Sequence, residues 1–247
     1  QGGADDFELD TDPSLPDVEA ARTSGPDASS QTLPESSAKS NGGEGDDPKS
    51  AQSKPEAGAP DASAPDGAAA GPAAKPTQGE VLITELMFDP VGSEPANEWF
   101  ELHNKANGPR TLTGLTIVDG GDRTHVIGAG VTIAAGAYVV FVRDKSAALA
   151  AKIPAAAIAY EYGAGLSDSA GILLANGATG SLRLRNGATT IAQASYGGWF
   201  SQVSGSSIQL ETLTYAAGSQ SAQWCVSVHN WANGAQKGSP GAPSNCP

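Results

Sequence analysis

The sequence has few basic residues, and this scarcity limits the kinds of partner that it can bind. Its 247 residues include 14 Lys and Arg against 27 Asp and Glu, a formal net charge of −13. Nucleic-acid binding needs a basic surface that neutralises phosphates, so nucleic acid is excluded as the main partner. Long apolar runs are also missing. The run 139–142 ends at Arg143 and Asp144, far short of the roughly 20 residues that span a bilayer, so we expect no transmembrane segment.

Most of the acidity lies in the first third of the chain, which also has almost no aromatic residues. Residues 1–79 contain 15 acidic and five basic residues, ten of the 17 prolines and one aromatic residue, Phe7. Such a segment cannot bury enough apolar surface to offset the entropy lost on ordering. We expect 1–79 to be a disordered acidic spacer rich in Ala, Pro, Ser and Asp, and 80–247 to be one folded domain. The spacer is interpreted as a stalk, with a solubilising tail as the alternative.

Only two cysteines are present, Cys225 and Cys246, and their spacing is not that of a metal site. We expect a disulfide between them, which predicts an oxidising compartment; two unrelated thiols are the alternative. The first residue is Gln1 instead of Met, which we interpret as the result of a removed secretory signal peptide. Both features predict an extracytoplasmic location: secreted, periplasmic or on the cell surface. Tethering by an N-terminal lipid stays open.

Helical periodicity is nearly absent from 80–247, where short runs rich in Val, Ile, Leu and Thr alternate with Gly, Asn and Asp turns. Turn signals spaced by roughly 8 to 12 residues are typical of an antiparallel sandwich or barrel. One alanine-rich stretch, 145–151, is expected to form a helical turn that ends before Pro154. The expected strands are 81–87, 99–104, 115–119, 124–127, 137–142, 171–175, 182–185, 191–196 and 207–210.

Turn chemistry predicts where these strands form hairpins. Asn186-Gly187 is a strong signal, because both residues tolerate the positive φ of a tight hairpin turn. The Asp-Gly-Gly-Asp sequence at 119–122 and Asn176-Gly177 give the same signal less sharply. Within 182–185 leucine and arginine alternate, so the leucines are expected to face the core and the arginines to face water.

An ordered series of sequence blocks extends from Gly79 to Pro243. It begins with Val-Leu-Ile-Thr-Glu-Leu-Met-Phe-Asp-Pro at 81–90 and Asn-Glu-Trp-Phe-Glu-Leu-His-Asn at 97–104. The later blocks are 112–119, 131–140, 166–171, 206–211, Trp224 and Gly-Ser-Pro-Gly-Ala-Pro at 238–243. The series resembles the bacterial lamin-tail domain of secreted and surface proteins. The resemblance implies an immunoglobulin-like β-sandwich, and it implies no catalytic residues.

Familiar catalytic motifs are absent from the sequence. It contains no G-x-S-x-G, HExxH, P-loop or GxGxxG pattern, and its three histidines, His103, His125 and His229, are scattered. We therefore expect no catalytic residues, no cofactor and no metal site.

Two groups of polar side chains nevertheless offer oxygen ligands. Glu98, Glu101 and Asn104, with a histidine at 103, form one carboxylate cluster. The acidic pair at 85 and 89 and the 119–122 turn form the other, which would suit calcium. For both groups the preferred interpretation is structural, as hydrogen bonds to loop backbone and as ordinary turn residues.

Large aromatic residues give the better indication of a binding site. Trp199, Phe200 and Trp231 lie in expected loops and are the candidate ligand contacts, because exposed rings bind sugars or protein partners. The alternative is that Trp199 or Trp231 fills an open end of the sandwich. Trp99 and Trp224 lie in apolar runs and are expected in the core.

These observations predict a non-enzymatic extracytoplasmic module for binding or scaffolding, displayed on a flexible stalk. Its expected partner is an envelope or extracellular protein or polysaccharide. Two alternatives are a polysaccharide-binding module that uses the loop aromatics and an uncharacterised metal-dependent hydrolase.

Overall fold

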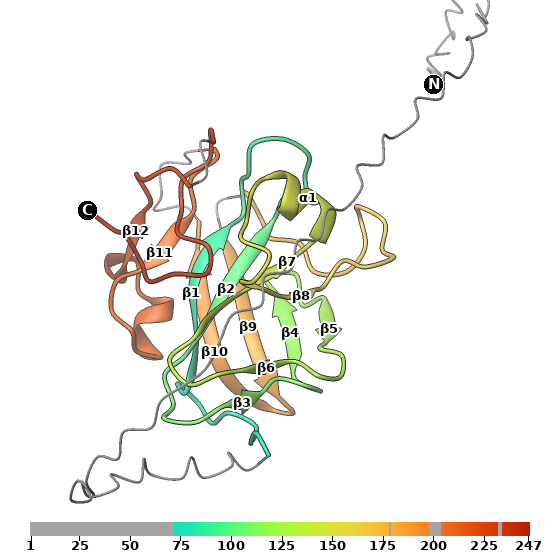
Figure 1. Ribbon diagram of the computed structural model, residues 1–247, viewed down its shortest axis with the longest axis vertical. Coiled ribbons are helices and arrows are strands. Elements are labelled where there is room, and N and C mark those ends of the chain that lie inside the picture. The colour runs from blue at the N-terminus through green and yellow to red at the C-terminus, as the bar shows by residue number, and fades with distance from the viewer. Residues whose placement is uncertain (1–71, 178, 198–203, 232–233) are drawn as a thin grey trace, which may run out of the picture. The chain divides into compact units, whose positions relative to one another are not determined.

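A computed structural model describes residues 72–177, 179–197, 204–231 and 234–247, so most of the predicted spacer lies outside the described residues. The strands are β1 (Val81–Met87), β2 (Trp99–Asn104), β3 (Arg110–Thr111), β4 (Thr116–Asp119), β5 (Thr124–Val126), β6 (Thr132–Ile133), β7 (Tyr138–Val142), β8 (Ile158–Glu161), β9 (Gly180–Asn186), β10 (Thr189–Tyr196), β11 (Ile208–Leu210) and β12 (Trp224–Val226) (Figure 1). The helix α1 is Lys145–Ala150, and two 3₁₀ turns are Ala216–Ser219 and Ser221–Gln223.

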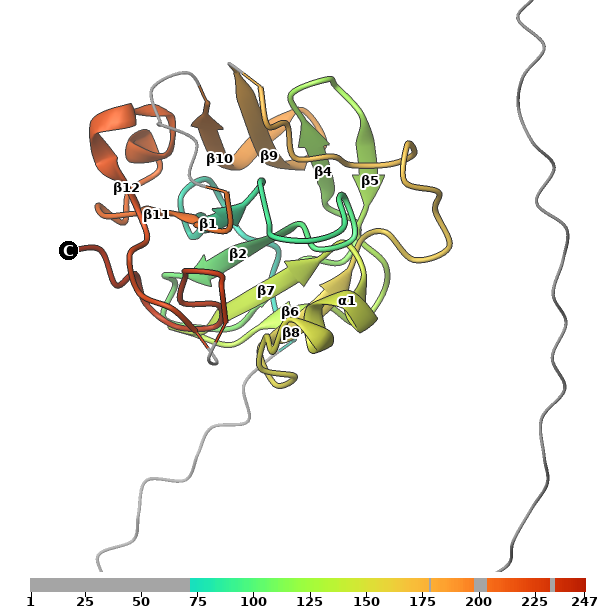
Figure 2. The ribbon, with the colours of Figure 1, turned by 90° about the horizontal axis from the view of Figure 1, so that it is seen from above.

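The strands form a sandwich of two main sheets. One sheet has the order β12-β11-β1-β2-β7-β8 and the other β10-β9-β4-β5, while β3 and β6 pair separately. Figure 2 shows the two sheets as stacked layers. Every pair of neighbouring strands is antiparallel except β7 and β8, which are parallel. The predicted immunoglobulin-like β-sandwich is confirmed.

Alternation of side chains along the strands creates the core between the sheets. In β9, Leu182 and Leu184 are buried in this core, whereas Arg183 and Arg185 are partly exposed on the other face, as predicted. The predicted hairpin between β9 and β10 is also confirmed, although Asn186 pairs with Thr189 and the turn itself is one residue later than expected. Gly187 has a φ of 57° there, a conformation that favours glycine.

The six-stranded sheet is buried on both faces. All residues of β1 and β2 are buried, and only one face can contact the core between the sheets. Phe100 and Leu102 belong to that core, whereas Met87 and Trp99 belong to a second apolar cluster with Val140 and Val142. We call the side of this sheet that faces away from the second sheet its outer face. Something other than the second sheet must cover the outer face, and the C-terminal residues do so.

The prediction of a strand at 171–175 is wrong. Here the backbone groups bond to buried charged side chains instead of a neighbouring strand. The amide N–H groups of Leu173 and Leu174 donate to carboxylates of Asp119 and Glu98, and the carbonyl of Ile172 accepts from Arg143. The hairpin expected at Asn176-Gly177 is therefore also wrong.

Other departures concern short elements and boundaries. The predicted helical turn is present as α1, and the Asp144 carboxylate caps its N-terminus by accepting from the amide of Ala147. The short strands β3, β6, β8 and β12 were not predicted. At the N-terminal end of the domain, Ala74 pairs with Arg110, and the amide of Gly79 donates to Ile191. The last residues of the expected spacer therefore lie against the domain.

Candidate functional site

Two buried glutamates face each other on the outer face of the six-stranded sheet. Glu85 in β1 lies directly opposite Glu101 in β2, after a bulge in β1 between Ile83 and Glu85. Each is 1% exposed. Directly opposite positions in an antiparallel pair bring side chains within contact, so like charges there repel each other. The pair is stable only if its charge is reduced or compensated by hydrogen bonds.

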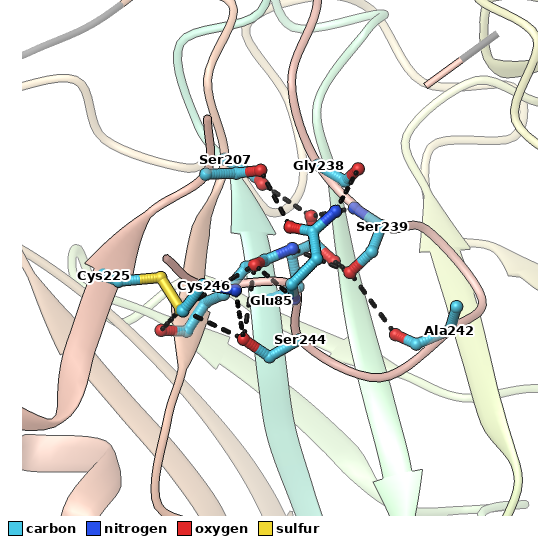
Figure 3. The surroundings of a disulfide bond; sticks show 11 residues. Glu85, Ser207, Cys225, Gly238, Ser239, Ala242, Ser244 and Cys246 are labelled. Carbon is cyan, nitrogen blue, oxygen red and sulfur yellow. Dashed lines mark hydrogen bonds between the residues drawn. A yellow bond between two sulfur atoms is a disulfide. The ribbon is translucent and has the colours of Figure 1, made fainter. Parts of the chain in front are cut away.

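The C-terminal segment supplies many of those hydrogen bonds. The Glu85 carboxylate accepts from the hydroxyl of Ser207 (2.5 Å) and from both the amide (2.9 Å) and the hydroxyl (3.1 Å) of Ser239 (Figure 3). Glu101 accepts from the hydroxyl of Thr84 (2.7 Å) and the amide of Gly241 (2.8 Å). The pair therefore holds the C-terminal segment against the outer face of β1 and β2.

The two carboxyl groups keep a proton to higher pH than ordinary glutamates do. Burial raises the pKa of Glu85 to about 7, and the donated hydrogen bonds only partly oppose this rise. Burial, and secondly the neighbouring Glu85, raise the pKa of Glu101 well above its ordinary value. Ionisation of one carboxyl makes ionisation of the other harder, so the two groups titrate as a pair.

Two glycines allow the C-terminal segment to approach so closely. A Cβ at Gly238 would come within 2.5 Å of a Glu85 carboxylate oxygen and 2.9 Å of the Ser207 hydroxyl. Gly241 has a φ of 85°, and a Cβ there would collide with Ala157. The Gly-Ser-Pro-Gly sequence thus has a physical explanation: the glycines permit contact, and the serine donates to the buried carboxylate.

The predicted disulfide between Cys225 and Cys246 is confirmed, with 6.0 Å between the two Cα atoms. It ties the end of the chain to β12, at the edge of the six-stranded sheet. Close by, the Gln209 side chain of β11 accepts from the amide of Asn245 (3.0 Å) and donates to the Ser239 hydroxyl (2.7 Å). We call residues 238–246 the C-terminal strap.

Of the three candidate ligand contacts, only Trp231 lies within the described residues. Its ring packs edge-on against Trp99, with 5.7 Å between the centroids, and its indole N–H donates to the carbonyl of Ala151 (3.0 Å). It also lines an open pocket of about 310 Å³ with Lys152 and Gln236. Trp231 is therefore anchored by packing and also borders the pocket. The other two candidates, Trp199 and Phe200, lie outside the described residues.

The two aromatic residues expected in the core are there. Trp99 is 1% exposed and Trp224 is 5% exposed. Trp99 packs in the outer apolar cluster and Trp224 in the core between the sheets.

The first group of possible metal ligands is divided among separate structural contacts. Glu98 accepts from the amide of Leu174 (2.9 Å), and Glu101 lies under the strap. The Asn104 amide group donates to three backbone carbonyls, and its oxygen accepts from Ala106. His103 stacks on Tyr138, with ring centroids 4.0 Å apart. These contacts agree with the expectation that Glu101 and Asn104 form hydrogen bonds with loop backbone.

The second group is also occupied by protein contacts. Asp119 is fully buried and accepts from the amides of Gly121, Arg123 and Leu173 and from the Arg123 guanidinium. Asp122 in the same turn forms an ion pair with Arg183 (2.7 Å). Asp119 thus joins the β4–β5 turn to the segment that follows Ile172.

Within the described ranges, only Glu211, Cys225 and Cys246 place three potential metal-ligating atoms within 4.8 Å of one another. Both cysteines are in the disulfide, so neither offers a thiolate. An acidic pocket of about 490 Å³, lined by Glu94, Glu98 and Asp168 among others, lies elsewhere on the domain. Burial raises the pKa of Glu98 to about 8. In the part of the chain that the structure describes, no helix has the length and apolarity to cross a membrane.

The fold is that of an immunoglobulin-like β-sandwich domain whose outer sheet face is covered by its own C-terminal strap. The family model of the Lamin Tail Domain matches residues 74–198, and the chain belongs to this family. The match confirms the lamin-tail resemblance for the blocks from 81 to 171 and includes Glu85 and Glu101, but it ends before the blocks at 206–211, Trp224 and 238–243. A search of curated proteins finds no match to the chain.

Sequence reasoning missed the pairing of the two buried glutamates. Glu85 and Glu101 lie in otherwise apolar strands, each within a run that the structure buries completely. An acidic residue inside such a run is a signal of a buried hydrogen-bonding partner. The partner could not be inferred, because the register that places the two side chains opposite each other includes a bulge.

Proposed function

We propose that the chain is a non-enzymatic, extracytoplasmic lamin-tail protein of the bacterial secreted or surface type, which binds or scaffolds a component of the cell envelope. The observation that carries the non-enzymatic part concerns the buried carboxylates Glu85, Glu98, Glu101 and Asp119. Each accepts hydrogen bonds from backbone or side-chain donors that hold loops or the strap in place. Glu85, Glu101 and Asp119, which line neither of the two pockets described above, are committed in this way to stabilising the fold, whereas Glu98 also lines the acidic pocket.

The proposed location is supported by the disulfide. Structural disulfides form and persist in oxidising compartments, and this one fixes the end of the domain. The composition of residues 1–79 supports their proposed role as a spacer, because proline and excess acidic residues favour an extended chain. The proposed partner is a protein or polysaccharide of the envelope or of the extracellular space.

A polysaccharide is a second, more specific candidate partner, and the pocket beside Trp231 favours it. Sugar rings stack on indole rings and hydrogen-bond to amides, and this pocket offers Trp231 together with Gln236 and Lys152. The side-chain oxygen of Gln236 is buried and has no hydrogen-bond partner among the described residues. A ligand hydroxyl could satisfy this oxygen only after the Gln236 side chain turns towards the pocket.

Co-sedimentation of the full chain with isolated cell-envelope fractions and with insoluble polysaccharides tests both proposals. We expect retention by the envelope fraction. If the pocket binds sugar, Gln236→Ala and Lys152→Gln weaken retention on polysaccharide, while Lys145→Gln, an exposed lysine outside the pocket lining, leaves it unchanged.

The outcomes separate the two candidates. Retention on the envelope fraction that persists in the pocket variants supports a different binding surface and contradicts the polysaccharide candidate. Failure of the unaltered chain to bind any fraction contradicts the envelope-binding proposal itself. Melting curves of each variant show whether the substitution also disturbed the packing of Trp231 on Trp99.

A further inference from the structure

We propose that the C-terminal strap is a conformational switch, released from the outer face of β1 and β2 when Glu85 and Glu101 are both ionised and the Cys225–Cys246 disulfide is reduced. This inference goes beyond the proposed binding function and does not depend on it. It rests on the contacts of the strap, on the charges around the glutamate pair and on the position of the disulfide.

The hold of the strap on β1 and β2 depends on the two carboxyl groups. In the described structure, the hydrogen bonds that residues 239–242 make to these two strands all end on Glu85 or Glu101. The remaining bonds of this stretch are internal or go to the Gln209 side chain of β11. A change at the two carboxyl groups therefore acts directly on the strap.

The surroundings of the pair contain little that could compensate a second negative charge. In β2, His103 is buried, and this burial lowers its pKa below the ordinary histidine value. Tyr138 of β7 has a raised pKa because of burial and stays uncharged. From β11 the neighbours are Ser207 and Gln209, which are polar but uncharged.

The strap itself has no basic residue, but it adjoins the partly exposed Lys237, which precedes Gly238, and the exposed His229, whose carbonyl accepts from the Gly238 amide. The strap presents Ser239, Gly241 and, towards Gln209, Ser244 and Asn245, and the nearby Ala157 is apolar. The closest further acidic group along β11 is Glu211, which is exposed.

Ionisation of both groups places two negative charges opposite each other at positions that the strap keeps 1% exposed. Repulsion between like charges is strong where the local dielectric is low. Admission of water relieves it, and water can reach the pair if the strap moves away. The pair holds its proton more tightly in the folded domain than in the unfolded chain, so the strap is most stable below the ordinary glutamate pKa and loosens as pH rises through the folded values.

The disulfide limits how far the strap can move. While Cys246 is bonded to Cys225 of β12, a detached strap is still attached at both ends and rebinds readily. A dithiol reductant converts the bond into two thiols, each sulfur gaining one electron and one proton, while the dithiol becomes a disulfide. The covalent link of the strap to β12 is then gone, so alkaline pH and reduction together release the strap from β1 and β2.

Amide hydrogen exchange of the full chain, measured at pH 6 and pH 9 with and without a dithiol, tests the proposal. The informative amides are those of Ser239 and Gly241, with the amide of Leu184 in β9 as an internal reference. Protection factors correct for the intrinsic effect of pH on exchange. In the oxidised chain we expect the strap protection to fall at least about tenfold between pH 6 and pH 9. Reduction at pH 9 removes the remaining protection of the strap amides, while reduction at pH 6 leaves most of this protection.

Charge variants provide the matched control. Glu85→Gln combined with Glu101→Gln keeps the shape but cannot ionise, so its strap protection no longer depends on pH. Asp168→Asn removes the same charge from an exposed position and keeps the dependence of the unaltered chain. If the double variant does not fold, protection of Leu184 is lost, and the comparison of the unaltered chain at two pH values still decides.

Two results overturn the proposal. One is a strap whose protection changes with pH no more than that of Leu184. The other is a strap that loses its protection on reduction at pH 6, since the disulfide alone would then hold it.

Discussion

Glu85 accepts three hydrogen bonds in a site with 1% exposure, so the chemistry of its replacement decides the stability of the domain. Glu85→Ala leaves the donors of Ser207 and Ser239 without an acceptor, and we expect it to lower the free energy of unfolding by about 2–4 kcal/mol. Glu85→Gln keeps an acceptor oxygen and is expected to cost less. Urea unfolding at pH 6 measures both. Equal losses for the two variants would show that the hydrogen bonds contribute little.

Gly238 shows how a single methyl group can displace the strap. Gly238→Ala places a Cβ within 2.5 Å of a Glu85 carboxylate oxygen, so we expect it to lower the free energy of unfolding by about 1–3 kcal/mol. Gly177→Ala is the matched control, because a Cβ there meets nothing within 4 Å. The melting temperature of Gly238→Ala should be lower than that of Gly177→Ala. A Gly238→Ala variant as stable as the control would contradict the close approach of the strap.

At the scale of elements, the Asp119 carboxylate supplies a hydrogen-bond acceptor to the segment 171–175, which is not part of a strand. This carboxylate joins the β4–β5 turn to the segment 171–175, in which the amides of Leu173 and Leu174 donate to side-chain carboxylates instead of to strand carbonyls. We expect Asp119→Ala to lower the free energy of unfolding by about 2–3 kcal/mol, because buried amides lose their acceptor. Hydrogen exchange should show faster exchange of the Leu173 amide, while the β1–β2 amides are unaffected. Uniform acceleration throughout the domain would argue against this local role.

The disulfide links the C-terminal strap covalently to β12. Because the two cysteines are 21 positions apart, the bond removes unfolded-state entropy worth about 3 kcal/mol. We expect the double variant Cys225→Ala, Cys246→Ala to lose about that much free energy of unfolding in urea titrations. If the double variant lost almost no free energy of unfolding, the disulfide would not restrict the unfolded chain. This would contradict the expected stabilisation.

The elements also show where sequence reasoning succeeds. Long strands with clear apolar runs, such as 81–87 and 99–104, were predicted with their observed bounds, and alternation gave the correct orientation of 182–185. The stretch 171–175 looks like a strand, but its bonding partners are side chains distant in sequence. Local pattern cannot predict such partners.

The candidate site was less predictable than the fold. The two cysteines were paired correctly, and the structural interpretation of Glu101 and Asn104 agrees with their contacts. The opposition of Glu85 and Glu101 depends on a bulge and on a C-terminal segment more than 130 residues away in sequence. The role of Trp231 likewise depends on Trp99, a partner that only the folded chain brings near.

At the scale of the whole molecule, the buried acids make stability depend on pH with a predictable sign. The pKa values of Glu85 and Glu98 rise to about 7 and about 8, and that of Glu101 is raised well above its ordinary value, all mainly because of burial. Their contribution is complete below the unfolded pKa near 4.5 and is lost as pH rises through the folded values. Glu80 has a pKa lowered to about 2, chiefly by its hydrogen bond to Arg110, so its contribution is constant above pH 5.

The free energy of unfolding of the full oxidised chain between pH 7.5 and pH 9 is the most direct test that these carboxyl groups hold the domain together. In this range His103 and His125, whose pKa values are lowered by burial, are neutral in both the folded and the unfolded chain. We predict a free energy that falls as pH rises, and a shallower fall in the Glu85→Gln, Glu101→Gln variant, in which Glu98 still contributes. A free energy that is constant or rises with pH, or an equal fall in the variant, would contradict the account.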